Sequence, residues 1–262
     1  IYIKKEMGFF IGMSTNGYKI AEKIKELKGI DIIFLSCDGP SQVHNFLRGK
    51  NSFKEVISSL EALKNSGICV MTTTVLTNLN IRYIDEILNL AKQYNALANF
   101  NRLEFFVDSP ARLHPHINEV KHLLLNKENR NKALKKLIAL KIAGEPVGSS
   151  FPYLKNALEW QDDQYVTLPE ASKYYRCWAG RAFGHIEADG NLYPCGWAAL
   201  RGFPGKNVLE GGFKPAWDSL EFLPGCRSCS HACGVENNLI LSLNFSSVLN
   251  ALFSCKKLGK WL

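Results

Sequence analysis

Apolar and polar positions alternate with two different periods over the first 107 residues of this chain. Four apolar runs have the length of strands and fall at residues 9–15, 31–36, 68–75 and 103–107. Between them, apolar side chains recur at i, i+3 and i+4 spacing, which predicts helices at residues 18–27, 52–65 and 81–94. Strands that alternate with helices are typical of βα units around a parallel sheet. We therefore predict an α/β fold for this part of the chain.

The rest of the chain changes in texture. Helical patterns cover residues 117–143 and 153–160, with a break at Gly144-Glu145-Pro146. Beyond residue 167 the chain is rich in Gly, Pro, Trp and Cys, and its pattern predicts a hairpin, a short helix and a long terminal helix. These three elements fall at residues 183–193, 214–221 and 236–253. We predict two domains, residues 1–166 and residues 167–262.

Composition is that of a globular protein. With 262 residues, of which 46% are hydrophobic and 21% charged, the chain can bury a sizeable core, which excludes disordered and collagen-like proteins. The net charge of +8 comes from basic residues scattered through helical stretches, so nucleic-acid binding is not expected. No run of 18 apolar residues predicts a transmembrane segment, and no signal-peptide pattern opens the sequence. We expect a soluble, cytoplasmic protein.

Five of the eight cysteines gather in the tail, at Cys177, Cys195, Cys226, Cys229 and Cys233. A hairpin that brings the first two together, facing the C-x2-C of Cys226 and Cys229, would supply four thiolates at one point. Three interpretations remain open, namely disulfides, tetrahedral zinc and an iron–sulfur cluster. Disulfides suit secreted chains, which the missing leader disfavours. Spacing does not decide between zinc and iron–sulfur.

Polar side chains follow three of the predicted strands. The strand ends are Ser14-Thr15-Asn16-Gly17, Ser36-Cys37-Asp38-Gly39-Pro40, and Thr72-Thr73-Thr74 running to Asn78 and Asn80. Ligands of parallel α/β proteins bind beyond the carboxyl ends of the strands, so these groups are candidate ligand contacts. Taken singly, each loop is better explained by ordinary turn chemistry. His44 either contacts such a ligand or begins a surface helix, and we expect buried thiols at Cys37 and Cys69.

Taken in order, these loops resemble those of the radical S-adenosylmethionine (radical SAM) enzymes. The resemblance is carried by the Thr-Asn-Gly strand end, the Ser-x-Asp-Gly-Pro of residues 36–40 and the threonines before Asn78. It implies a partial (β/α)6 TIM-like barrel whose first βα units are missing. It also places Ser36, Asp38 and Arg48 near S-adenosylmethionine. Asn16 and Thr74 are implied as neighbours of the same pocket.

The tail resembles the SPASM or twitch extension of the same enzymes, a small cysteine-rich domain. It carries Cys-x-Ala-Gly from Cys177, then Asp-Gly-x-x-Tyr-Pro-Cys ending at Cys195, then Cys-x2-Cys-x3-Cys from Cys226 to Cys233. The resemblance implies one auxiliary 4Fe–4S cluster, ligated by Cys177, Cys195 and two of the last three cysteines. Four ligands would suit electron transfer, whereas three would leave one iron open.

The resemblance implies an enzyme in which a second, reduced 4Fe–4S cluster cleaves S-adenosylmethionine and a 5′-deoxyadenosyl radical abstracts hydrogen from a substrate. A peptide or protein is favoured over a small-molecule substrate, with ferredoxin or flavodoxin as reductant. The C-x3-C-x2-C loop that holds this cluster is absent from the sequence, and we expect it in βα units before Ile1, so that the chain alone would be inactive. Two alternatives stay open: a non-catalytic iron–sulfur electron-transfer or binding module, and a zinc-stabilised α/β domain.

Overall fold

The computed structural model describes residues 6–104, 121–160, 166–221 and 226–254 of the chain. The chain divides into two compact units. Unit 1 comprises Ile1–Leu103, His122–Leu154 and Leu249–Leu262, and unit 2 comprises Glu104–Lys121 and Lys155–Val248. Each unit has buried side chains of its own. The domain boundary after residue 166 stays a prediction.

Unit 1 contains a four-stranded parallel sheet in the order β1-β2-β3-β4. The strands are β1 (Gly12–Thr15), β2 (Ile32–Ser36), β3 (Cys69–Leu76) and β4 (Leu97–Arg102). Side chains along β3 alternate between buried and half-buried, so that the two faces of the sheet differ in environment. This sheet confirms the prediction of an α/β fold built on parallel strands.

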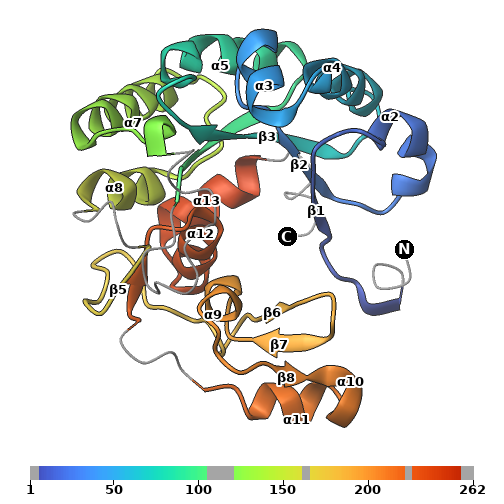
Figure 1. The fold of residues 1–262 in the computed structure, drawn as a ribbon, viewed down its shortest axis with the longest axis vertical. Coiled ribbons are helices and arrows are strands. Elements are labelled where there is room, and N and C mark those ends of the chain that lie inside the picture. The colour runs from blue at the N-terminus through green and yellow to red at the C-terminus, as the bar shows by residue number, and fades with distance from the viewer. Residues whose placement is uncertain (1–5, 105–120, 161–165, 222–225, 255–262) are drawn as a thin grey trace. The chain divides into compact units, whose positions relative to one another are not determined.

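Helices cover one face of this sheet, as Figure 1 shows. They are α2 (Ile20–Lys23), α3 (Ser41–Arg48), α4 (Ser52–Leu63), α5 (Ile84–Gln93) and α7 (Lys127–Ile142), with short 3-10 turns at Ile24–Leu27, Ile81–Tyr83 and Lys121–Leu123. Ile33 and Leu35 of β2 and Leu60 of α4 are at most 1% exposed between the two layers. Their burial supplies the hydrophobic free energy that holds the helices on the sheet.

The fourth strand lies earlier in the chain than residues 103–107, where the apolar pattern predicts it. Residues 105–107 lie outside the described residues, and the strand is β4, Leu97–Arg102. Asn95 ends α5 in the left-handed conformation, with a φ of 54°, so the chain turns into the strand directly. Asn99 and Asn101 lie on the half-buried face of the sheet, opposite Thr73 and Val75. These polar side chains interrupt the apolar run that a strand search relies on.

Helix α3 carries a residue whose environment differs from the prediction. His44 is only 1% exposed, and its Nδ1 accepts a hydrogen bond from the Asp38 backbone N–H at 3.0 Å. The interpretation of His44 as a surface residue is therefore wrong. Cys37 is a buried thiol, as predicted, whereas Cys69 is half-buried and takes part in a disulfide, which corrects the prediction of a free thiol there.

Unit 2 is built from short antiparallel strands and short helices. Strand β5 (Thr167–Leu168) pairs with β9 (Ser228–Cys229), and β6 (His185–Ile186), β7 (Asn191–Tyr193) and β8 (Lys206–Asn207) form a three-stranded sheet. The β6–β7 pair confirms the predicted hairpin. The helices are α9 (Gly196–Leu200), α10 (Val208–Gly211), α11 (Phe213–Asp218) and α12 (Ala232–Leu241), while α8 (Phe151–Glu159) and α13 (Phe245–Ser254) each include residues of both units.

The predicted long terminal helix over residues 236–253 is two helices, α12 and α13. Leu243 separates them with a φ of 55°. The Ser242 hydroxyl accepts a hydrogen bond from the Arg176 backbone N–H at 3.1 Å, and the Asn244 side chain accepts one from the Ser247 N–H at 3.3 Å. Both side chains bond to backbone groups at the break, which an apolar period does not reveal. No helix among the described residues is both long and apolar enough to cross a membrane.

Candidate functional site

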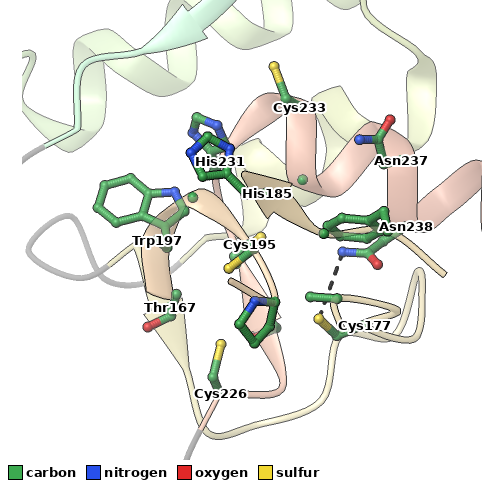
Figure 2. Close-up of a pocket in the computed structure, with 18 of the residues that line it drawn as sticks. Thr167, Cys177, His185, Cys195, Trp197, Cys226, His231, Cys233, Asn237 and Asn238 are labelled. Carbon is green, nitrogen blue, oxygen red and sulfur yellow. Dashed lines mark hydrogen bonds between the residues drawn. The ribbon is translucent and has the colours of Figure 1, made fainter. Parts of the chain in front are cut away.

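All five tail cysteines line one cavity of unit 2, drawn in Figure 2. The cavity has a volume of about 320 Å³, and apolar atoms form most of its surface. Its walls come from segments that are far apart in the chain: the loop after β5, the end of β7 with α9, strand β9 and the start of α12. The lining also includes Tyr175, His185, Trp197, His231 and Asn238. Folding therefore gathers the residues that the sequence singled out by spacing.

Tyr175 fastens the loop that carries Cys177 to the strand that carries Cys229. Its hydroxyl donates to the Cys229 carbonyl oxygen at 2.8 Å and accepts from the Cys229 backbone N–H, also at 2.8 Å. The same hydroxyl lies 3.9 Å from Cys229 Sγ. Tyr175 is 6% exposed, so these bonds form away from water. Its hydroxyl therefore holds the two cysteine-bearing segments together.

Asn238 of α12 holds the other side of the Cys177 loop. Its Oδ1 accepts from the Trp178 backbone N–H at 2.7 Å, and its Nδ2 points at Cys177 Sγ from 4.0 Å (Figure 2). The Trp178 indole N–H donates to Ser242 at 3.1 Å. In the sequence, Asn238 is one of three polar residues after the last tail cysteine, and only its burial at 1% exposure shows that it serves the site.

Cys195 and Cys226 approach each other through apolar packing. Cys226 is 7% exposed and forms a small buried cluster with Ala198, against which Cys195 and Phe203 also pack. Cys195 is the N-cap residue of α9, where its carbonyl oxygen accepts a hydrogen bond from the Ala198 backbone N–H at 3.1 Å, and the nearby N–H groups of Ala198 and Trp197 oppose the rise in its pKa that burial causes. Backbone donors at a helix start stabilise a thiolate. This position suits a metal ligand.

The cavity thiols perturb one another. Burial, followed by the charges of Cys177 and Cys195, raises the pKa of the Cys226 thiol to about 12. Burial and then the Cys177 charge also raise the pKa of Cys229, and burial is the largest cause of the raised pKa of Cys195. Four thiolates in such a place require a cation among them, because desolvation and mutual repulsion both favour the protonated form.

A single metal ion and an iron–sulfur cluster require different arrangements of cysteines. Among the residues that the structure describes, no three His, Cys, Asp or Glu side chains converge closely enough to hold one ion. Tetrahedral zinc, with Zn–S bonds of about 2.3 Å, needs sulfurs roughly 3.8 Å apart. A 4Fe–4S cluster binds each cysteine through a different iron, so its ligands surround a volume instead of a point. Cysteines spread around a cavity favour the second geometry.

The fifth cysteine has different neighbours. Cys233 is exposed in the first turn of α12, two residues after His231. His231 Nδ1 lies 2.8 Å from Glu104 Oε2, and the Trp197 ring meets the imidazole edge-on at a centroid distance of 5.7 Å. Burial lowers the pKa of His231, but the bonds to Cys233 and Glu104 outweigh it and raise that pKa to about 10. The sequence did not predict the contact between His231 and Glu104, because the two residues lie far apart in the chain.

Ser36, one of the predicted cofactor residues, lies on the half-buried face of the sheet in unit 1. Ser36 ends β2 opposite Thr73 of β3, and Thr73 lies opposite Asn99 of β4. These three side chains are half-buried on the face that alternates with the helix-covered one. Asn16 follows β1 at the same edge and is exposed. The result is a row of hydroxyl and amide groups across β2, β3 and β4, level with the carboxyl end of β2.

Asp38 and Arg48 instead bond to each other in the second loop. Arg48 Nε donates to Asp38 Oδ2 at 2.6 Å, and the Val75 backbone N–H donates to Asp38 Oδ1 at 2.9 Å. Asn80 Nδ2 donates to the Asp38 carbonyl oxygen at 3.0 Å. The Asp38 side chain is 3% exposed, so its carboxylate is engaged by the protein. This network fixes the loop after β2 against β3.

Thr74 belongs to the helix-covered face. It is fully buried, and its hydroxyl donates to the Cys37 carbonyl oxygen at 2.6 Å. The adjacent Thr73 shares the face of Ser36. Strand alternation separates these two threonines, and a run of three threonines in the sequence does not show which one faces a ligand.

Comparison with known proteins finds a family that resembles part of this chain. The family model described as the Radical SAM superfamily matches residues 1–91. These 91 residues are similar to the radical SAM superfamily. Among curated radical SAM relatives, mycofactocin maturase MftC of Mycolicibacterium smegmatis is 28% identical over 244 residues, which cover 84% of this chain and 56% of MftC. MftC of Mycobacterium tuberculosis matches to the same extent. The chain thus spans little more than half the length of these relatives.

Some solved structures are similar in fold to this chain. One is anSMEcpe with bound AdoMet and a peptide, at 18% identity and a TM-score of 0.55, covering 80% of this chain and 57% of that protein. Another is Streptococcus suis SuiB bound to its precursor peptide SuiA, at 12% identity and a TM-score of 0.55. That match covers 82% of this chain and 48% of SuiB. At these identities the likeness concerns the fold.

Proposed function

We propose that this chain is the substrate-handling and auxiliary-cluster part of a radical SAM enzyme that modifies a peptide. The observation that carries the proposal is the pairing of a radical SAM sheet with a tail cavity lined by five cysteines. In the proposed enzyme, a SAM-bound cluster supplies a 5′-deoxyadenosyl radical, and the tail holds a second 4Fe–4S cluster.

The barrel part of the proposal rests on strand order. Each strand of unit 1 pairs with the next one along the chain, β1 to β2 to β3 to β4, all parallel. Doubly wound sheets reverse their strand order at a switch point, whereas barrels do not. Together with the likeness to anSMEcpe, this order supports a partial (β/α)6 barrel.

We infer that S-adenosylmethionine binds at the carboxyl ends of these strands, with Asn16, Ser36 and Thr73 as contacts. Hydroxyl and amide groups there can bond to ribose hydroxyls, an amino group or a carboxylate. Asp38 and Arg48 would act indirectly, since they bond to each other and hold the loop after Ser36 in place. The part of the Arg48 guanidinium not bonded to Asp38 can still meet a carboxylate.

The substrate class follows from the relatives. MftC is a maturase, and anSMEcpe and SuiB were solved with peptides bound. We infer a peptide or protein substrate for the whole protein, with ferredoxin or flavodoxin as the electron source. The non-catalytic module and the zinc domain are the alternatives that the experiment must separate from this enzyme.

The test is anaerobic expression of the complete gene, followed by incubation with S-adenosylmethionine and dithionite. The proposed enzyme forms 5′-deoxyadenosine, measured by liquid chromatography and mass spectrometry, and shows absorbance near 400 nm that bleaches on reduction. A protein that contains iron and sulfide but forms no 5′-deoxyadenosine would be the non-catalytic module. A colourless protein with one zinc would be the zinc-stabilised domain.

A further inference from the structure

The Tyr175 hydroxyl has one proton and two possible acceptors for it. Its oxygen accepts a hydrogen bond from the Cys229 backbone N–H at 2.8 Å. The proton can go to the Cys229 carbonyl oxygen, which lies 2.8 Å away, or to Cys229 Sγ, which lies 3.9 Å away. A hydroxyl hydrogen rotates to suit its partners, so the charge on the two acceptors decides which one receives it.

The Cys229 carbonyl oxygen has a second donor. Asn156 of α8 is 5% exposed, and its Nδ2 donates to this oxygen at 3.3 Å. The Ser172 hydroxyl donates to Asn156 Oδ1 at 3.4 Å, which orients the amide with its NH2 group toward the carbonyl. A carbonyl oxygen that loses one of two donors is still hydrogen-bonded. The Tyr175 hydroxyl can therefore turn away without leaving a buried acceptor unsatisfied.

Cys229 Sγ becomes the better acceptor when it carries more negative charge. A cluster that takes up an electron places part of that charge on its ligand sulfurs, and a hydrogen bond to a charged acceptor is about twice as strong as one to a neutral acceptor. Tyr175 is 6% exposed, so the bond forms away from water. Hydrogen bonds to the sulfurs are one of the factors that set the reduction potential of an iron–sulfur cluster.

We propose that Tyr175 is a positioning residue whose hydroxyl turns from the Cys229 carbonyl oxygen to Cys229 Sγ when the auxiliary cluster is reduced, and that this turn raises the reduction potential of the cluster. The inference rests on the proposed function, because it assumes a 4Fe–4S cluster in the tail cavity with Cys229 among its ligands. One electron enters the cluster from an external reductant. The hydroxyl keeps its proton, and no covalent bond forms or breaks.

The experiment reconstitutes this 262-residue chain anaerobically with iron and sulfide. Because the chain contains no C-x3-C-x2-C motif, the bound cluster is that of the tail cavity. Titration with dithionite, followed by electron paramagnetic resonance of the reduced cluster, gives the midpoint potential. Tyr175→Phe should lower this potential, because it removes the donor that favours the reduced state. Tyr174→Phe changes the neighbouring half-buried tyrosine and should match wild type.

A second variant leaves Tyr175 in place. Asn156→Leu has the same branched shape and removes the other donor to the Cys229 carbonyl oxygen. The Tyr175 hydroxyl should then stay on the carbonyl in both redox states, so the midpoint potential should again be lower than in wild type. A tyrosine that only holds the two segments together would not produce this result. The measurement also tests the inference if Tyr175→Phe does not fold.

Iron analysis and circular dichroism accompany each titration. An unchanged midpoint potential in either variant, with wild-type iron content and a wild-type circular dichroism spectrum, would overturn the inference. A wild-type chain that binds no iron would instead defeat the auxiliary cluster of the proposed function. The two failures are therefore distinct.

Discussion

Asp38 belongs to the loop motif, and its polar groups bond to other parts of the protein. Its backbone N–H, carbonyl oxygen and both carboxylate oxygens have partners, in His44, Asn80, Arg48 and Val75. These bonds tie the loop after β2 to β3 and α3. The motif spacing drew attention to the residue, and its hydrogen-bond partners are visible only in the structure.

Asp38→Ala should reduce the free energy of unfolding by about 2–4 kcal/mol, because it leaves the Val75 N–H and the Arg48 charge without their acceptor. Urea unfolding followed by circular dichroism measures the change. Asp85→Ala is the matched control, since Asp85 forms an exposed ion pair with Lys136 and should cost less than about 1 kcal/mol. Equal losses in the two variants would contradict this role for Asp38.

His44 makes the stability of unit 1 depend on pH. Burial lowers its pKa below the ordinary 6.5, so the unfolded chain takes up a proton that the folded chain resists. Stability is therefore complete above pH 6.5 and declines as the pH falls below it. H44N keeps an acceptor for the Asp38 N–H and removes the titrating group. Urea unfolding at about pH 7.5 and pH 5.5 should show that the lower pH reduces the free energy of unfolding more in wild type than in H44N. Identical reductions in the two proteins would contradict this effect of His44.

At the scale of elements, the cavity depends on pieces too short to be stable alone. Strands β5 and β9 have two residues each, and the segment between β5 and β6 that carries Cys177 contains no helix or strand. Hydrogen bonds from the side chains of Tyr175, Asn238 and Ser242 hold these segments together, as a longer ladder of backbone hydrogen bonds would in a larger sheet. Such contacts have no local sequence period, so the sequence pattern did not predict them.

Tyr175→Phe should reduce the free energy of unfolding of unit 2 by about 1–3 kcal/mol, because the buried Cys229 N–H loses its bond to the Tyr175 hydroxyl and the Cys229 carbonyl keeps only the bond from Asn156 Nδ2. Tyr174→Phe is the matched control, since Tyr174 is half-buried next door and should cost less than about 1 kcal/mol. Chemical denaturation monitored by Trp fluorescence reads both. A Tyr175→Phe variant as stable as the control would show that the hydroxyl does not fasten the loop.

At the scale of the whole molecule, the two units should respond differently to the cluster. A group that binds the folded state stabilises the part that holds it, and unit 1 has its own core between sheet and helices. Anaerobic removal of iron with a chelator should lower amide protection in α12 and β9, and leave β2 and β3 unchanged. Hydrogen exchange read by mass spectrometry measures this. A uniform loss of protection would mean that the units unfold together.

The sequence by itself determined the βα alternation, the hairpin of the tail, the family and the five cysteines that share a cavity. These features leave local signals, in apolar period, turn residues and motif spacing. Tertiary structure alone decided that Thr73 rather than Thr74 shares the face of Ser36, that the terminal helix breaks at Leu243, and that Cys233 turns away from the other sulfurs. Each of these depends on the direction of a side chain or on a partner from a distant segment. The spacing of residues along a chain shows neither the direction of a side chain nor its partner from a distant segment.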